Sequence, residues 1–437
     1  MNRLPNRNAH LTWCLAIAAS LMATGTNRAA QYTPTFSIDY QGPTAGSTPG
    51  AATGLADGFF GAPIDEGQIL TQSNPGLPGP NPPLPGPLPA PGVMVDSAHG
   101  SALGTVAGGL GVVPGTYKGV EVDALSYGRD HGEQLVFSVD EFARGIQNST
   151  QNHPNVFSEG TAGAKEASAD VFSYLGPAVP TQLTGISGAG NRAIIDGNGV
   201  APFGGPGLGL IEPNPPTFSS PYDRGDNLDA LDINTSPEDV FRPIFFSLDS
   251  RFQDPLEATP GTTLPNTGTA IGNGFFGGDV VVTLAGALPV LYAPASVLGL
   301  DIEGTDTDDL DALALWDDGV LSPTTGLPTF SPDRDKILFS VRRGSKVVGM
   351  PDSLLGLPIE EGDILAPPVA GGLTPSIFIP AENLGLATIR SALVSTTDFG
   401  DDLDAMDLTR VVPEPSTAVM LLFATTGLLA TRRRRTT

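Results

Sequence analysis

The hydrophobic positions of this chain fall in short runs of three or four residues, separated by longer stretches that are polar or rich in Gly and Pro. A strand that begins with Phe-Ser occurs four times, at residues 36–38, 137–139, 246–248 and 339–341. A further strand follows each copy, at residues 68–70, 170–172, 279–281 and 363–365. Such runs between turn-forming residues predict β-strands, and a helical fragment is expected only near residues 381–386.

Two more landmarks repeat in step with these strands. An Asp-Ala phrase occurs at residues 122–125, 228–231, 310–313 and 403–406. A Leu-Gly phrase precedes it each time, at residues 110–112, 208–210, 298–300 and 384–386. Four landmarks that recur in one order, with a period of about 95 residues, indicate a fourfold structural repeat.

The order of the landmarks predicts how the repeats close. The chain opens on a Phe-Ser strand and ends on an Asp-Ala strand, so its first and last copies are each incomplete. In a ring, the strand near Asp404 completes the sheet that begins at Phe36, and the ring then has no open ends. We therefore predict an all-β fold of four repeats, arranged as a four-bladed propeller-like ring with long loops. The alternatives are another repeat β-fold and tandem β-sandwich modules.

The repeated phrases resemble those of the hemopexin-like four-bladed propeller. In that family an Asp-Ala phrase opens each blade, a Phe-rich strand follows, and the first strands line a narrow axial channel. The resemblance implies that small residues lie where the four blades crowd together, namely Ala124, Ala230, Ala312 and Ala405. The chain departs from the family in its longer repeats, its fewer aromatic residues and its lack of a disulfide between the ends of the ring.

Both ends of the chain have the character of targeting segments. Arg3 and Arg7 precede an apolar run at residues 11–22, and small residues follow, which predicts a secretory signal peptide over residues 1–30. At the other end, sixteen mostly apolar residues at 416–431 would span only about 24 Å as a helix, less than the roughly 30 Å of a bilayer core. The arginines that follow them fix that end in the cytoplasm.

The C-terminal segment, residues 412–437, resembles the PEP-CTERM sorting tail of exported bacterial proteins. The residues that carry the resemblance are Pro413, Glu414, Pro415, Arg432, Arg433, Arg434 and Arg435. It implies a signal peptidase and an exosortase-type protease as partners, transient membrane contact through the C-terminal transmembrane segment, and a final location at the cell surface or in the extracellular matrix. The alternative is an ordinary membrane anchor that is never cleaved.

The composition of the body, residues 31–411, excludes several classes of protein. The only cysteine, Cys14, lies in the signal peptide, so the body has no disulfide and no thiolate metal site. Only Glu414 of the 47 acidic residues, but seven of the 22 basic ones, lie outside the body, which leaves it a net charge near −31. Such a charge argues against nucleic acid as a partner. The repeats within this β domain are expected at about residues 35–128, 135–234, 244–317 and 337–408.

Acidic loops are the candidate metal sites. The densest stretch spans residues 301–311, and oxygen-rich loops of this kind suit Ca²⁺. The predicted ligands are Asp306, Asp308, Asp309 and Asp311. The alternative is a solvated loop in which these residues form turns. The aspartate of each Asp-Ala phrase either faces a central channel and holds a cation or bonds to the backbone at a strand start; its fourfold repetition favours a structural role.

No catalytic or cofactor-binding residue is predicted. The three histidines of the body lack zinc-site spacing, no Gly-x-Ser-x-Gly motif occurs, and the Gly-rich runs lack the Lys-Ser/Thr of a phosphate loop. We therefore expect an exported, non-enzymatic surface or extracellular-matrix protein with a binding or structural role, and exopolysaccharide is a candidate partner. The alternative is a carbohydrate-active enzyme that acts on matrix polysaccharide through paired carboxylates.

Overall fold

The computed structural model divides into two compact units, Tyr32–Thr409 and a unit made of the two terminal segments. The structure describes residues 31–39, 56–59, 61, 64–73, 88–97, 109–112, 122–126, 135–140, 145–147, 153–160, 167–176, 190–200, 205–211, 226–233, 243–249, 269–284, 286–394 and 399–411. The predicted signal peptide and sorting tail lie outside these residues.

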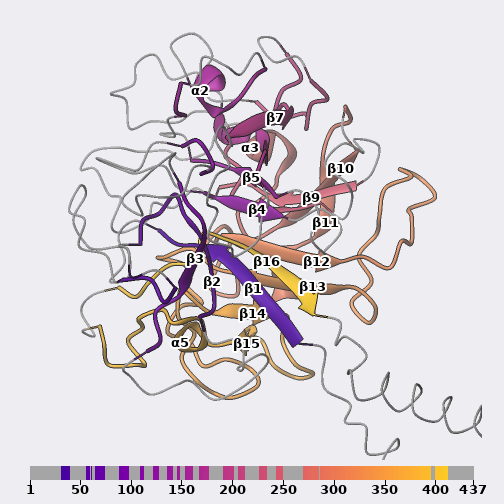
Figure 1. Ribbon diagram of the computed structural model, residues 1–437. Coiled ribbons are helices and arrows are strands. Elements are labelled where there is room, and N and C mark those ends of the chain that lie inside the picture. The colour runs from indigo at the N-terminus through magenta and orange to yellow at the C-terminus, as the bar shows by residue number, and fades with distance from the viewer. Residues whose placement is uncertain are drawn as a thin grey trace, which may run out of the picture. The chain divides into compact units, whose positions relative to one another are not determined.

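Across the described residues, sixteen strands form four antiparallel sheets of four strands each (Figure 1). Blade 1 has the order β16-β1-β2-β3, and blades 2, 3 and 4 comprise β4 to β7, β8 to β11 and β12 to β15 in chain order. The first strands are β16 (Ala405–Val411), β4 (Ala124–Ser126), β8 (Ala230–Asp232) and β12 (Ala312–Trp316). The second strands are β1 (Gln31–Ser37), β5 (Val136–Ser138), β9 (Pro243–Ser247) and β13 (Lys336–Ser340). The predicted Asp-Ala and Phe-Ser strands are these two sets.

The outer half of each blade holds two more strands. The third strands are β2 (Ile69–Thr71), β6 (Val171–Tyr174), β10 (Val280–Leu284) and β14 (Ile364–Ala366), as predicted. The fourth strands are β3 (Gly92–Val95), β7 (Asn191–Ile195), β11 (Val290–Ala293) and β15 (Ser376–Ile379). The register between third and fourth strands shifts once in every blade, beside the first residue of β2, β6, β10 and β14. Such a shift bends the strand and increases its twist.

The four sheets form a ring, which confirms the predicted propeller. Four buried apolar clusters hold it together, one at each junction between neighbouring blades. Phe137 lies in the cluster between blades 1 and 2, Phe246 between blades 2 and 3, and Phe245 between blades 3 and 4. The fourth cluster joins Ile379 of blade 4 to Phe36 of blade 1, so the last blade packs against the first.

Pairing of the last strand with the earliest one closes the ring. β16 is the neighbour of β1 in the sheet of blade 1, so the chain's two ends build a single blade (Figure 1). Each repeat delimited in the sequence therefore contains the second, third and fourth strands of one blade and the first strand of the next. The ring is closed by hydrogen bonds and apolar packing rather than by a covalent bond.

The last two residues of each Asp-Ala phrase lie on opposite faces of a first strand. Successive side chains of a strand point to opposite faces, so the alanine and the residue after it contact different neighbours. Ala312 lies in the cluster between blades 4 and 1, whereas Leu313 lies in the cluster between blades 3 and 4. Ala124, Ala230 and Ala405 follow the same rule. The small side chain fits because β4, β8 and β12 lie beside one another.

The serine of the Phe-Ser strand joins neighbouring blades. Ser37 Oγ of blade 1 donates to the carbonyl of Val122 in blade 2 at 2.6 Å. Ser247 Oγ of blade 3 donates to Leu310 O in blade 4 at 2.8 Å, and Ser340 Oγ of blade 4 to Leu403 O in blade 1 at 2.7 Å. Each acceptor directly precedes the aspartate of an Asp-Ala phrase. The two repeated phrases are thus linked across three of the four junctions.

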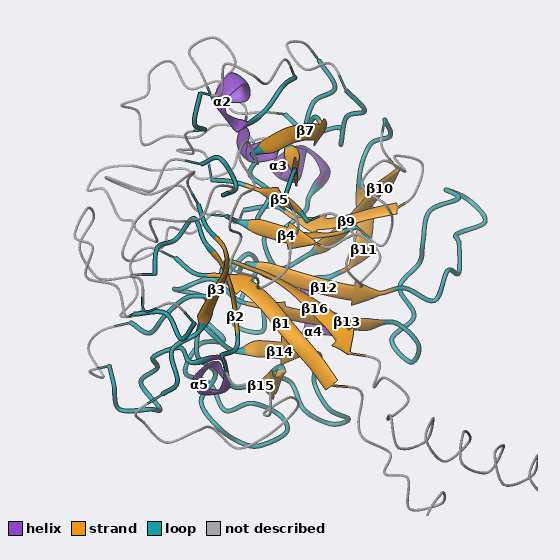
Figure 2. Ribbon diagram, in the orientation of Figure 1, coloured by secondary structure: helices purple, strands orange, loops and turns teal. Residues whose placement is uncertain are grey.

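Helices are short in the described part of the chain, and strands and loops dominate (Figure 2). They are α2 (Val156–Glu159), α3 (Thr269–Asn273), α4 (Ala295–Leu298), α5 (Ala381–Leu384) and a 3₁₀ turn at Ala167–Ala169. The Leu-Gly phrases end α4 and α5: Gly299 and Gly385 have left-handed backbone, with φ of 82° and 92°. A Cβ on Gly385 would lie 2.1 Å from Pro89 O, so this position also requires the close approach of another backbone segment. Helix α5 coincides with the helical fragment expected from the sequence.

Enlarging the alanine in the crowded centre should destabilise the ring. We expect Ala312→Leu to lower the free energy of unfolding by about 1–3 kcal/mol, because Ala312 is only 1 % exposed and its neighbours must move. Thermal or denaturant unfolding measures the change. The exposed Ala287→Leu is the control and should leave stability nearly unchanged. An Ala312→Leu variant as stable as the wild type would contradict the packing described above.

Removing the inter-blade serine hydroxyls should weaken the ring additively. Each of Ser37→Ala, Ser247→Ala and Ser340→Ala is expected to lower the free energy of unfolding by about 1 kcal/mol, since each removes one buried hydrogen bond. The triple variant should lose about the sum of the three, because the sites lie at different junctions. The exposed Ser296→Ala in α4 is the matched control. Denaturant titration that finds the triple variant no weaker than this control would refute the inter-blade role.

Candidate functional site

A cluster of acidic residues lies at one end of the first strands. The aspartate of each Asp-Ala phrase directly precedes a first strand, and the residue two positions earlier is acidic or an amide. The antiparallel second strand ends at the same edge, so the residue two positions after each Phe-Ser serine joins this group. We call the set the axial cluster. Its described members are Asp123, Asp229, Asp311, Asp404, Asn227, Asp309, Asp402, Asp39, Asp140, Asp249 and Arg342, together with Arg343, which follows Arg342.

Two arginines from one blade are the basic members of the axial cluster. The residue two positions after each Phe-Ser serine is Asp in three repeats, but blade 4 has Arg342 there, followed by Arg343. Arg342 Nη1 forms ion pairs with Asp249 and, at 3.5 Å, with Asp309 Oδ2. Arg343 is fully buried and pairs with Asp39 through Nη1. Its backbone N–H donates to Asp402 Oδ2 at 2.8 Å, and its Nη2 lies 3.8 Å from the same oxygen.

The carboxylates of the axial cluster gather in two groups of three. One group is Asp229, Asp249 and Asp309, and the other is Asp311, Asp402 and Asp404. Within each group, one oxygen from every residue lies within 4.8 Å of the others. The Oδ2 atoms of Asp229, Asp311 and Asp404 are buried and have no hydrogen-bond partner among the described residues.

Burial and crowding make these carboxyl groups weak acids. The pKa values of Asp229, Asp311 and Asp404 all lie well above the usual aspartate range. Burial is the largest cause in each case, and neighbouring carboxylates raise the values further; Arg342 or Arg343 lowers them by a smaller amount. These three carboxyl groups therefore lose their protons less readily than exposed aspartates do.

The four predicted calcium ligands separate in the structure. Asp309 and Asp311 lie in the axial cluster, in different groups of three. Asp308 accepts backbone N–H groups on both oxygens, from Val347 at 2.8 Å and Asp301 at 2.6 Å. Asp306 Oδ1 accepts from the backbone of Gly277 at 3.3 Å. The four residues therefore do not meet at one shared site, and calcium binding by this set stays a prediction.

A third acidic group lies at the C-terminal end of β12. Asp317, Asp318 and Asp335 meet there, and the hydroxyl of Tyr292 lies 3.0 Å from Asp317 Oδ2 and 2.9 Å from Asp335 Oδ2. Burial and these carboxylates raise the pKa of Tyr292. Asp317 and Asp318 each accept the backbone N–H two residues onward, as turn-forming aspartates do. Arg334 pairs with Asp318 at 2.8 Å, so this group has its own cation.

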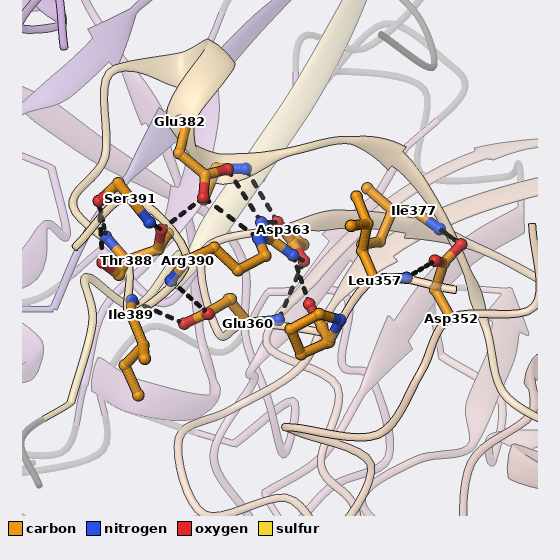
Figure 3. A network of polar contacts seen from close by, with 12 residues as sticks. Asp352, Leu357, Glu360, Asp363, Ile377, Glu382, Thr388, Ile389, Arg390 and Ser391 are labelled. Atoms are coloured by element: carbon orange, nitrogen blue, oxygen red, sulfur yellow. Dashed lines mark hydrogen bonds and ion pairs between the residues drawn. The ribbon is translucent and has the colours of Figure 1, made fainter. Parts of the chain in front are cut away.

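A second buried polar network stabilises blade 4 (Figure 3). The guanidinium of Arg390 forms two hydrogen bonds with Asp363, one of them at 2.6 Å, and two with Glu382, at 3.0 and 3.1 Å. Asp363 also accepts the N–H of Ala381 at 2.9 Å and so connects β14 to the start of α5. Burial raises the pKa of Glu360 to about 7, although Arg390 and two backbone N–H groups lower it. This network is a structural support for the loop at residues 387–391.

Sequence reasoning identified the Asp-Ala aspartates but missed the arginines that accompany them. One sequence feature identifies Arg342: it is the only copy in which the residue two positions after the Phe-Ser serine is not acidic. Arg390 has no such repeat signature, because its network depends on the tertiary contact between β14 and α5. The chemistry available to the axial cluster is that of oxygen donors, which suit hard cations.

Comparison with known proteins identifies one segment of the chain. Residues 411–435 match the PEP-CTERM protein-sorting motif. The motif indicates an exported protein that is sorted to the cell surface and processed by an exosortase, which confirms the resemblance of the tail. Neither curated proteins nor solved structures provide a match to the chain. In the part of the chain that the structure describes, no helix has the length and apolar character needed to cross a membrane.

The stability of blade 4 should depend on the titration of Glu360. A carboxyl whose pKa rises from 4.5 to about 7 on folding favours the folded state below the unfolded pKa, and this contribution disappears as pH rises through the folded pKa. We expect the free energy of unfolding to fall between about pH 4.5 and 7, by up to about 3 kcal/mol from this group.

Glu360→Gln should remove this part of the pH dependence, whatever its effect on stability at one pH. Denaturant unfolding across the same pH range measures it. The exposed Glu303→Gln is the control and should keep the wild-type slope. A Glu360→Gln variant with the full wild-type slope would assign the dependence to other groups.

Proposed function

We propose that the protein acts at the cell surface or in the extracellular matrix as a non-enzymatic propeller, with a binding or structural role. The sorting motif supports the destination, because the motif marks exported proteins processed by exosortases. The repeated residues support the role: the serine of the Phe-Ser strand bonds neighbouring blades, and the alanine of the Asp-Ala phrase packs between them.

One observation carries the proposal: buried acidic groups of blade 4 are bound to other parts of the protein itself. In blade 4, Asp363 and Glu382 are bound to Arg390, and both oxygens of Asp308 accept backbone N–H groups. Carboxylates of this kind are engaged in holding loops and helices in place. A general acid and base for glycoside hydrolysis need to face a substrate instead.

Exopolysaccharide is the proposed binding partner. A net charge near −31 on the body keeps the protein soluble and makes binding to nucleic acid or anionic surfaces unfavourable. A polysaccharide that is neutral, or that is bridged to the protein by cations, is not repelled by this negative charge.

Processing of the tail should depend on the PEP motif. We expect the wild-type chain, expressed in a host with an exosortase and carrying epitopes in the body and at the C-terminus, to lose the C-terminal epitope and reach the surface or matrix fraction. Glu414→Ala with Pro415→Ala should retain both epitopes in the membrane fraction. Immunoblotting of cell fractions measures this, and Arg435→Lys, which keeps the charge, is the control. A motif variant that is processed like the wild type would show that this tail acts only as an anchor.

A binding experiment with the same secreted protein distinguishes binding from catalysis. Incubation with exopolysaccharide from the exporting host should retain the protein on the polymer and release no new reducing ends. Release of reducing ends by the purified protein would favour the carbohydrate-active enzyme, and neither retention nor release would leave a purely structural role.

A further inference from the structure

We propose that two copies of the chain associate through an uncharged apolar patch on blade 4, formed by the exposed side chains of Leu354, Leu355, Val369 and Leu373. We call this set the blade-4 patch. This inference concerns the assembly of the protein and does not depend on the proposed surface role.

The two loops that carry the blade-4 patch lie side by side. The turn at residues 351–358 belongs to the connection between β13 and β14, and the loop at residues 367–375 joins β14 to β15. The backbone N–H of Ser353 donates to Pro375 O at 3.0 Å, and Ser353 Oγ accepts the N–H of Val369 at 3.1 Å. The four apolar side chains therefore belong to one local surface.

The exposure of these side chains sets the patch apart. Leu373 is 77 % exposed, the largest value for a large apolar side chain among the described residues, and Leu354, Leu355 and Val369 are exposed as well. Single exposed apolar residues are common on soluble proteins, whereas several that gather on one surface mark an interaction site. The gathering of four in two touching loops is the observation that points to a partner.

A buried carboxylate holds the patch in a fixed conformation. Asp352 is only 3 % exposed and accepts the backbone N–H groups of Leu355 at 3.0 Å, Leu357 at 2.8 Å and Ile377 at 3.2 Å. The turn that bears Leu354 and Leu355 is thus tied to β15. A surface that is already ordered loses little conformational entropy when it binds, which favours its use as an interface.

Charge identifies a second copy of the chain as the occupant. Residues 364–381 contain no charged side chain, and residues 347–359 contain only the buried Asp352. Two bodies with a net charge near −31 repel each other over most of their surface, but the blade-4 patch brings no exposed carboxylate against its own copy. The same patch on a second chain matches it in size and in lack of charge, as a two-fold symmetric interface requires.

The size of the patch predicts a weak dimer. A standard stable interface has about 20–30 residues on each side, so four apolar side chains and their loops support only a transient contact. Salt should strengthen this contact, because it screens the repulsion between the two acidic bodies. A partner held by opposite charge would respond to salt in the reverse direction.

Cysteine cross-linking of the full chain, purified in mild detergent, tests the proposal, because the body has no cysteine of its own. In a Cys14→Ser background, Leu373→Cys and Leu355→Cys should each give a dimer with a bismaleimide reagent on a denaturing gel. The matched control is Val200→Cys, which is 61 % exposed and follows β7 of blade 2, a blade that shares no junction with blade 4. It should give little dimer, whereas association driven by the detergent would cross-link all three variants equally.

A charge placed in the patch gives a second measurement. Leu355→Glu should reduce the dimer formed by Leu373→Cys about tenfold or more, since the new carboxylate would face its own copy. Ile211→Glu, an equally exposed change on blade 2, should leave the dimer unchanged. Raising the salt from about 0.05 M to 0.5 M should increase cross-linking. Absence of the dimer, equal cross-linking through Val200→Cys, or a decrease with salt would overturn the proposal.

Discussion

The pairing of β16 with β1 is the interaction on which the remaining structure depends. It places residues from the two ends of the chain in one sheet and converts four similar blades into a ring with four apolar junctions. A chain without a cysteine in its body can form no disulfide across this closure. Apolar packing of Phe36, Met406 and Leu408 against blade 4, together with the hydrogen bond from Ser340 to Leu403, provides the closing contact instead. These contacts form only when the last strand, which ends at the sorting tail, has joined the first.

Fourfold repetition also concentrates negative charge. The same Asp-Ala phrase that fits the blades together brings an aspartate from every blade to the axis, where each carboxylate raises the pKa of its neighbours. Exact repetition would make the centre a ring of like charges. The chain departs from the repeat at Arg342 and Arg343, which form ion pairs with Asp249 and Asp39. The ring is therefore symmetric in its packing and asymmetric in its charge.

Much of this architecture could be predicted from the sequence, because the first, second and third strands carry recurring residues and their order implies closure. The fourth strands could not, since β3, β7, β11 and β15 share no common phrase and follow a register shift. The four predicted calcium ligands are spread over different parts of the structure for a geometric reason. Acidic residues that are close along the chain need not be close in space. Alternate residues of an extended segment share a side, so Asp309 and Asp311 lie in the axial cluster, whereas Asp308 accepts the backbone N–H of Val347.

An acidic chain with few basic residues can bury so many carboxylates only if other groups supply the donors. Backbone N–H groups do most of this. Asp352 accepts from the backbone of Leu357 and Ile377 (Figure 3) and from that of Leu354, and thereby fixes a turn and a strand of blade 4 together. Asp226 accepts from Ile211 and Thr269 in the same way. Each such N–H group donates to the carboxylate in place of water and so offsets part of the free-energy cost of burying it. In the described part of the chain, turns and strands are thus fixed in place by the same residues that make the protein acidic, and arginine adds donors to some of these carboxylates, as Arg390 does to Asp363.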